Sequence, residues 1–264
     1  IGLGHVGRCI PVAKRMYEQG AQILFSTYLD GVSYAYHEGF SVSEVPPVGF
    51  AFESEGTINF KKTAAFASLT VLRQVNAEIE LIKAFKPDVV VSDSRVSSLI
   101  AAELLGIPKL CILNQFRIVV PREEIPYQIA KFLEEGVLAL LGKVWTLATL
   151  VLIPDFLPPY TLSVGNLRMP KSYGKNVKLI GPILPVHPNN LPSQGKLRKK
   201  LELSQNKPVI FVPISGPERE RIHFAVLFQR ILKKFPDDYQ VVMSLGLPNV
   251  SPEPRRYGCL TVFN

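Results

Sequence analysis

The first residues that could do chemistry lie at the amino end of the chain. His5 follows Gly4 in a glycine-rich loop, and a helix is expected over residues 8–18. A neutral imidazole can take a proton from a sugar or lipid hydroxyl near neutral pH, as the general base of an inverting transfer does. His5 is therefore our candidate general base. A histidine that caps the helix or faces solvent is the alternative.

Asp93 is the second candidate, because it directly follows the valine-rich strand expected over residues 88–92. The loops that follow parallel strands open at one edge of a sheet, so we expect Asp93 and His5 to meet there. A hydrogen bond between them would fix the imidazole tautomer and stabilise the imidazolium formed during transfer. An aspartate at this position can also cap the next helix, and both roles can coexist.

The glycines of the first loop allow a different interpretation. Gly2, Gly4 and Gly7 match the GxGxxG fingerprint, whose glycines let the backbone approach a pyrophosphate at a helix N-terminus. That fingerprint normally includes an acid at the end of the second strand, about 20 residues further on. Here the strand expected over residues 22–27 ends without one, and Asp30 lies late. An NAD(P)-dependent oxidoreductase remains an alternative.

The elements that must position these groups alternate between helix and strand. Helices are expected over residues 61–85, 96–105 and 123–149, and strands over residues 88–92, 109–113, 151–153, 209–214, 240–244 and 259–263. Short junctions marked by glycine or proline indicate parallel sheets. We predict an α/β protein of two Rossmann-like domains with parallel sheets, the first over residues 1–182 and part of a second over residues 183–264. The first strand and the end of the second domain are expected to be missing.

The charge and the cysteine content of the sequence indicate which partners, which metal or disulfide sites and which location to expect. The net charge is +8, and residues 183–264 carry 12 Lys and Arg against 6 Asp and Glu. A basic surface favours anionic partners such as phosphorylated sugars and lipid headgroups. The basic run at residues 196–200 has no aromatic neighbour for stacking, so no nucleic acid is expected. Three widely separated cysteines predict no disulfide framework, no metal site and a cytoplasmic location.

The most apolar stretch, residues 137–153, is interrupted by Lys143. It is shorter than the ~20 residues that a membrane-spanning helix needs. Two arrangements remain open: the helix lies on the inner face of a membrane, or it packs against the sheet.

Taken in order, several short motifs resemble the GT-B glycosyltransferases, and in particular UDP-glycosyltransferases, lipid-linked N-acetylglucosaminyltransferases and uncharacterised archaeal relatives. They are Gly4-His5, Ser92-Asp93, Gly106-Ile107-Pro108 and Gly181-Pro182. The resemblance implies an inverting hexosyltransferase that moves a sugar from a nucleoside-diphosphate sugar such as a UDP-sugar to a hydroxyl acceptor, lipid-linked acceptors included. It implies no cofactor. It also implies that His5 is the base and that Asp93 orients it.

The same resemblance implies that residues 1–182 bind the acceptor, that residues 183–264 bind the nucleotide-sugar, and that particular residues contact both substrates. The donor's phosphates are expected to meet Gly4 and the turn formed by Ser215, Gly216, Pro217 and Glu218, and acceptor hydroxyls are expected to meet Asn114 and Gln115. A strand, a small-residue turn and a helix also form a reasonable anion site on physical grounds, although many such turns are only connections. A UDP-sugar epimerase and a non-catalytic nucleotide-binding module remain further alternatives.

Overall fold

The computed structural model of the chain describes residues 3–47, 60–117, 119, 126–216, 218–246 and 253–264. The chain forms two compact units. Unit 1 comprises residues 1–42, 49–65 and 184–264, and unit 2 comprises residues 43–48 and 66–183. The change of unit after residue 183 falls beside the predicted domain boundary. Residues 1–42, however, belong to unit 1, whereas we expected them with residues 66–182. The predicted domain division stays a prediction.

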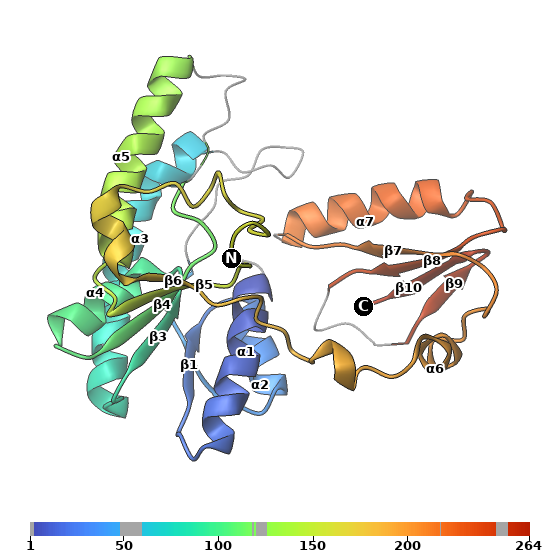
Figure 1. Ribbon diagram of the computed structural model, residues 1–264, viewed down its shortest axis with the longest axis horizontal. Helices are drawn as coiled ribbons and strands as arrows, with labels where there is room; N and C mark the ends of the chain where they lie inside the picture. The colour runs from blue at the N-terminus through green and yellow to red at the C-terminus, as the bar shows by residue number, and fades with distance from the viewer. Residues whose placement is uncertain (1–2, 48–59, 118, 120–125, 217, 247–252) are drawn as a thin grey trace. The chain divides into compact units, whose positions relative to one another are not determined.

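Unit 2 is built on a parallel sheet of four strands in the order β3-β4-β5-β6 (Figure 1). The strands are β3 (Val90–Asp93), β4 (Lys109–Ile112), β5 (Leu150–Ile153) and β6 (Val177–Leu179). Ser92 lies opposite Cys111, and Cys111 lies opposite Val151. Runs of valine, leucine and isoleucine suit such strands, because both faces of a parallel sheet are covered. The predicted parallel pairing of these strands is confirmed.

The helices of unit 2 are α4 (Val96–Leu104), α5 (Tyr127–Trp145) and α3 (Phe60–Phe85) from residue 66 onward, with a 3₁₀ helix η1 (Lys171–Asn176). Leu99 of α4 and Trp145 of α5 pack with Val151 of the sheet in one buried cluster. Phe116 contacts Trp145 edge to face, with ring centroids 6.0 Å apart. This core lies beneath the loops that follow β3 and β4.

The amino-terminal part of unit 1 contains α1 (Leu3–Glu18), β1 (Leu24–Thr27) and α2 (Asp30–His37). β1 pairs with β2 (Ser41–Glu44), whose last two residues belong to unit 2. We expected a loop up to residue 7, but α1 begins at Leu3. The reason is that Val6, Ile10 and Ala13 form one apolar stripe with helical spacing, and this stripe packs in a buried cluster with Ala35 of α2.

The carboxyl-terminal part of unit 1 holds a second sheet in the order β7-β8-β10-β9. Its strands are β7 (Val209–Pro213), β8 (Gln240–Ser244), β9 (Arg255–Tyr257) and β10 (Leu260–Phe263). β7, β8 and β10 are parallel, whereas β9 forms an unpredicted antiparallel hairpin with β10. The remaining elements are the 3₁₀ helix η2 (Pro188–Asn190), α6 (Gln194–Lys200) and α7 (Glu218–Leu232). α7 covers one face of the sheet (Figure 1).

Candidate functional site

His5, the predicted base, lies in the first turn of α1. Its Nδ1 atom is 3.4 Å from Nη2 of Arg8, one helical turn further on. A guanidinium group can only donate, so Nδ1 accepts in this contact and the proton of the neutral ring is on Nε2. The predicted pair with Asp93 needs the opposite tautomer, with a proton on Nδ1. His5 belongs to unit 1 and Asp93 to unit 2, so their pairing stays a prediction.

Gly4, predicted to meet the donor's phosphates, precedes His5 in α1. Among the residues that the structure describes, a Cβ atom added at Gly4 would meet nothing within 4 Å. Packing therefore does not require a glycine here, and the backbone is open to a ligand. Gly2, the other glycine of the predicted turn, lies outside the described residues.

Asp93 is the last residue of β3 and lies at the carboxyl edge of the sheet in unit 2. Ser94, which follows it, has a φ of 61° and donates its hydroxyl to Oδ1 of Asp93 at 3.2 Å. The Ser94 N–H donates to the Ile112 carbonyl at 2.9 Å, and the Ser94 carbonyl accepts the indole N–H of Trp145 at 2.9 Å. Positive φ is unusual for serine and costs free energy, so core contacts are what hold this turn.

Asp93 is not itself the N-cap residue of the helix that follows it. The residue at the N-cap of α4 is Arg95, and its side chain makes no cap hydrogen bond. Asp93 lies two residues before that position. The end of β3 and the turn at Ser94 place its carboxylate, and the orienting role stays a prediction.

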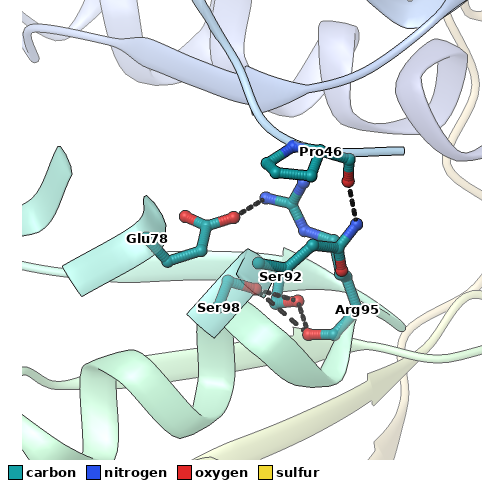
Figure 2. A network of polar contacts seen from close by, with 6 residues as sticks. Pro46, Glu78, Ser92, Arg95 and Ser98 are labelled. Atoms are coloured by element: carbon teal, nitrogen blue, oxygen red, sulfur yellow. Dashed lines mark hydrogen bonds and ion pairs between the residues drawn. The ribbon is translucent and has the colours of Figure 1, made fainter. Parts of the chain in front are cut away.

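A buried polar network supports the turn that carries Asp93 (Figure 2). Oε1 of Glu78, on α3, lies 2.5 Å from Nη2 of Arg95, and the two side chains are 3% and 20% exposed. The Arg95 carbonyl accepts from the hydroxyl of Ser92 at 2.8 Å and lies 3.1 Å from that of Ser98. Both the backbone and the side chain of Arg95 are thus fixed, two residues after Asp93.

The same helix face also holds the backbone at Pro46, just after β2. Gln74, which is 1% exposed, donates its side-chain amide to the Pro46 carbonyl at 2.6 Å. None of the residues in this network was among the predicted site residues, although its neighbour Asp93 was. The network's signal is the spacing of Val75, Glu78 and Ile82, which places an acid in a buried apolar stripe. A buried acid needs a partner, so the pattern predicts an ion pair.

Asn114 and Gln115 follow β4 at the same edge of the sheet, and both are exposed. The next residue, Phe116, is fully buried, and its N–H donates to the Asn166 carbonyl at 3.0 Å. The buried ring anchors the loop, so the two polar side chains stay at the surface. This position is compatible with the predicted contacts to acceptor hydroxyls.

Asp155, after β5, organises a neighbouring loop and was missed by the sequence analysis. Its Oδ1 accepts the N–H groups of Phe156 at 2.7 Å and Leu162 at 3.1 Å, and its Oδ2 accepts that of Ser163 at 2.8 Å. The hydrogen bond from Leu162, helped by the other two, lowers the pKa of the Asp155 carboxyl against the opposing effect of burial. The carboxylate therefore closes the loop over residues 156–163.

This loop presents apolar side chains to solvent. Phe156, Leu157, Tyr160 and Leu162 are 44%, 64%, 76% and 82% exposed. Single exposed apolar side chains are common on protein surfaces, but several together on a fixed loop are typical of a binding surface. The loop adds an apolar surface to the same edge of the sheet.

The predicted phosphate turn follows β7 in unit 1. Ser215 is exposed, and Gly216 has a φ of 113°, a backbone conformation that favours glycine. Pro217 lies outside the described residues, and only the backbone of Glu218, the first residue of α7, is described. The predicted order of strand, small-residue turn and helix is present, and such a turn can bind an anion.

Comparisons with known proteins agree with this architecture. No protein-family model matches the chain. It is 31% identical over 198 residues to an uncharacterised glycosyltransferase of Methanosarcina mazei, covering 69% of this chain and 48% of that protein. A protein of the same description from Methanosarcina acetivorans is 31% identical over 186 residues, which cover 66% of this chain and 46% of that protein. The chain spans about half the length of these curated relatives.

Solved structures resemble it as well. The spinosyn forosaminyltransferase SpnP aligns with a TM-score of 0.54 and 16% identity over 97% of this chain and 65% of that chain. Medicago truncatula UGT71G1, complexed with UDP-glucose, gives a TM-score of 0.52 and 14% identity over 90% of this chain and 62% of that chain. Streptomyces SsfS6, complexed with thymidine diphosphate, gives a TM-score of 0.52 and 15% identity over 96% of this chain and 67% of that chain. At these identities the likeness concerns the fold alone.

The resemblance to GT-B glycosyltransferases is thereby confirmed: the curated homologues carry the name glycosyltransferase, and the structural neighbours have the GT-B fold. Within the part of the chain that the structure describes, no helix is both long and apolar enough to cross a bilayer.

Proposed function

We propose that the protein transfers a sugar from a nucleoside-diphosphate sugar to a hydroxyl acceptor. The observation that carries the proposal is the similarity to archaeal proteins named glycosyltransferase over 69% of the chain. The parallel α/β fold supports it. So do the neighbours of this fold that were solved with UDP-glucose and with thymidine diphosphate.

In this proposal His5 removes the acceptor's proton while the acceptor oxygen attacks the anomeric carbon and the nucleoside diphosphate departs. Inversion at that carbon follows from the single displacement. To accept the proton at Nε2, the ring must carry its own proton on Nδ1, the atom that now faces Arg8. The Arg8 contact must therefore break, and Asp93 is the carboxylate that we propose takes its place.

We assign the acceptor to the carboxyl edge of the sheet in unit 2. Asn114 and Gln115 offer amide groups for hydroxyls, and the loop held by Asp155 offers apolar surface. That combination suits an acceptor with both a hydroxyl-bearing part and a hydrophobic part, such as a lipid-linked sugar or an aromatic aglycone. The donor's phosphates are assigned to Ser215 and Gly216.

Peripheral membrane contact is the remaining part of the proposal. The inner side of α5 packs in the core, as Trp145 shows, but its outer side exposes Ile129, Phe132 and Leu140, which are 53%, 76% and 69% exposed. These residues recur at helical spacing. An apolar stripe of this kind can enter the boundary between lipid headgroups and acyl chains.

The experiment that tests the transfer reaction uses the protein at full length with UDP-, GDP- and TDP-sugars and hydroxyl-bearing acceptors, and measures release of the nucleoside diphosphate. His5→Ala should lower turnover by roughly 10²–10⁴, because it removes a positioned base, and should leave donor binding nearly unchanged. Asp93→Asn should cost no more than His5→Ala, and the double variant should be little worse, since the two act as one unit. Unchanged turnover in His5→Ala would remove the mechanism.

A further inference from the structure

Arg221 is a buried cation near the amino end of α7. The residue is 3% exposed. Its Nη1 donates to the Gly246 carbonyl at 2.6 Å, and its Nη2 forms an ion pair with Oδ2 of Asp30. Its Nε is buried without a hydrogen-bond partner among the described residues. A buried guanidinium needs compensation for its lost hydration, and here Asp30 supplies the counter-charge.

The side chain of Arg221 lies where the turns after β7 and β8 meet. Gly246, just after β8, has a φ of 60°, and a Cβ atom added there would lie 3.0 Å from the Ile214 carbonyl oxygen and 4.0 Å from Cδ of Arg221. Ile214 directly precedes Ser215 and Gly216. Arg221 is therefore a cation beside the turn to which we assign the donor's phosphates, and the start of α7 adds the positive end of a helix dipole.

Asp30 is a replaceable partner for this cation. It is the first residue of α2, all of which lies in unit 1, and its side chain is 31% exposed, against 4% for that of Arg221. The carboxylate can therefore return to water at small cost, whereas the guanidinium cannot. Carboxylate and phosphate oxygens are recognised by guanidinium in the same geometry, so a phosphate can take the place that Asp30 holds.

We propose that Asp30 acts as an internal substitute for the donor's phosphates: it pairs with Arg221 in the free protein, and the donor's diphosphate displaces it. The inference rests on the proposed function, because it assumes that the turn at Ser215 binds phosphates. Displacement costs part of the binding free energy, so the apparent affinity for the donor is lower than the site could give. Release of Asp30 also frees the start of α2.

Glu220, in the first turn of α7, is another acid beside the phosphate turn and provides a matched control. Oε2 of Glu220 would lie 3.1 Å from a Cβ atom added at Gly216. Glu220→Gln removes one negative charge at the turn, as Asp30→Asn does, but it leaves the Arg221–Asp30 pair in place. General electrostatic repulsion of phosphate predicts similar gains from both substitutions, whereas displacement predicts a gain from Asp30→Asn alone.

The experiment measures binding of UDP, TDP, uridine and inorganic pyrophosphate to the protein at full length by calorimetry. Asp30→Asn should bind the preferred diphosphate about tenfold tighter, because the competing charge-assisted hydrogen bond is gone. Arg221→Gln should bind it at least about tenfold more weakly, and Glu220→Gln should change affinity less than about threefold. Uridine affinity should not change in any variant. A parallel gain for pyrophosphate identifies the phosphates as the displacing group.

A second measurement needs no substitution. In the wild-type protein, saturating UDP or TDP should accelerate amide hydrogen exchange in the first turn of α2, because Asp30 loses its anchor. Diphosphate binding that is equal or weaker in Asp30→Asn, equal gains in Glu220→Gln, or unchanged exchange in α2 would each overturn the inference while leaving the proposed function intact. If no diphosphate bound to the wild type or to any variant, the proposed function would fail with it.

Discussion

Glu78→Gln should destabilise unit 2 through the network that supports Asp93. The Glu78 side chain is 3% exposed, and Oε1 lies 2.5 Å from Nη2 of Arg95. Removing one partner of a fully buried ion pair typically costs about 3–5 kcal/mol, because the other charge loses its compensation. The Arg95 side chain is 20% exposed, so water recovers part of that loss. We therefore expect a decrease of about 2–3 kcal/mol in the free energy of unfolding.

Urea unfolding followed by tryptophan fluorescence measures this change directly. Trp145 is the only tryptophan in the sequence, and it is buried in unit 2 with 5% of its surface exposed. Its emission therefore reports the unfolding of the unit that contains the network. With a typical urea slope of about 2 kcal/mol per molar, the midpoint should fall by about 1 M.

The control is the same substitution two residues further along α3. Glu80 pairs with Lys83 at 3.2 Å, but these side chains are 76% and 59% exposed. Glu80→Gln should change the free energy of unfolding by less than about 0.5 kcal/mol, since exposed pairs contribute little. Equal effects of Glu78→Gln and Glu80→Gln would refute the reasoning, because burial would then not decide the contribution of the pair.

Two further predictions concern the loop over residues 156–163, which Asp155 closes, and the outer side of α5. The lowered pKa of Asp155 stabilises the folded protein at neutral pH, and this contribution is lost as pH falls through the folded pKa. The stability difference between wild type and Asp155→Asn should therefore shrink between about pH 5 and pH 2 in urea titrations, and a constant difference would contradict the assignment. Phe132→Glu should weaken sedimentation with anionic phospholipid vesicles, whereas Gln128→Glu, on the same helix, should have little effect. Equal losses would indicate charge repulsion alone.

The parallel sheet of unit 2 could be predicted because its signals are local. Pro87 and Gly106 follow the preceding helices, and the short apolar runs at residues 89–91 and 110–113 supply the apolar residues of β3 and β4. The start of α1 was harder to predict from the sequence, because a glycine-rich segment is typical of a loop. Only the structure shows that Val6 packs with the core around Ile10. The hairpin of β9 and β10 has only three residues in its first strand and so gives little periodicity.

The candidate site depends more on contacts between distant residues. Asp93 could be found because it ends a clear strand, and its position at the sheet edge follows from topology. Glu78 has a local signal, an acid within an apolar helical stripe, that the sequence analysis did not use. Arg221 has none, because its partner Asp30 lies 191 residues away in the sequence. A buried pair of that kind becomes visible only in the folded chain.

Calorimetry of nucleotide binding distinguishes the proposed transferase from its dinucleotide-dependent alternative, because the two need different ligands. UDP, GDP, TDP and NAD are titrated in turn into the protein at full length. We expect at least one of the three diphosphates to bind more tightly than NAD, since the strand that follows α1 ends at Thr27 without an acid for a ribose. Binding of NAD at micromolar concentration, with no binding of the diphosphates at millimolar concentration, would contradict it.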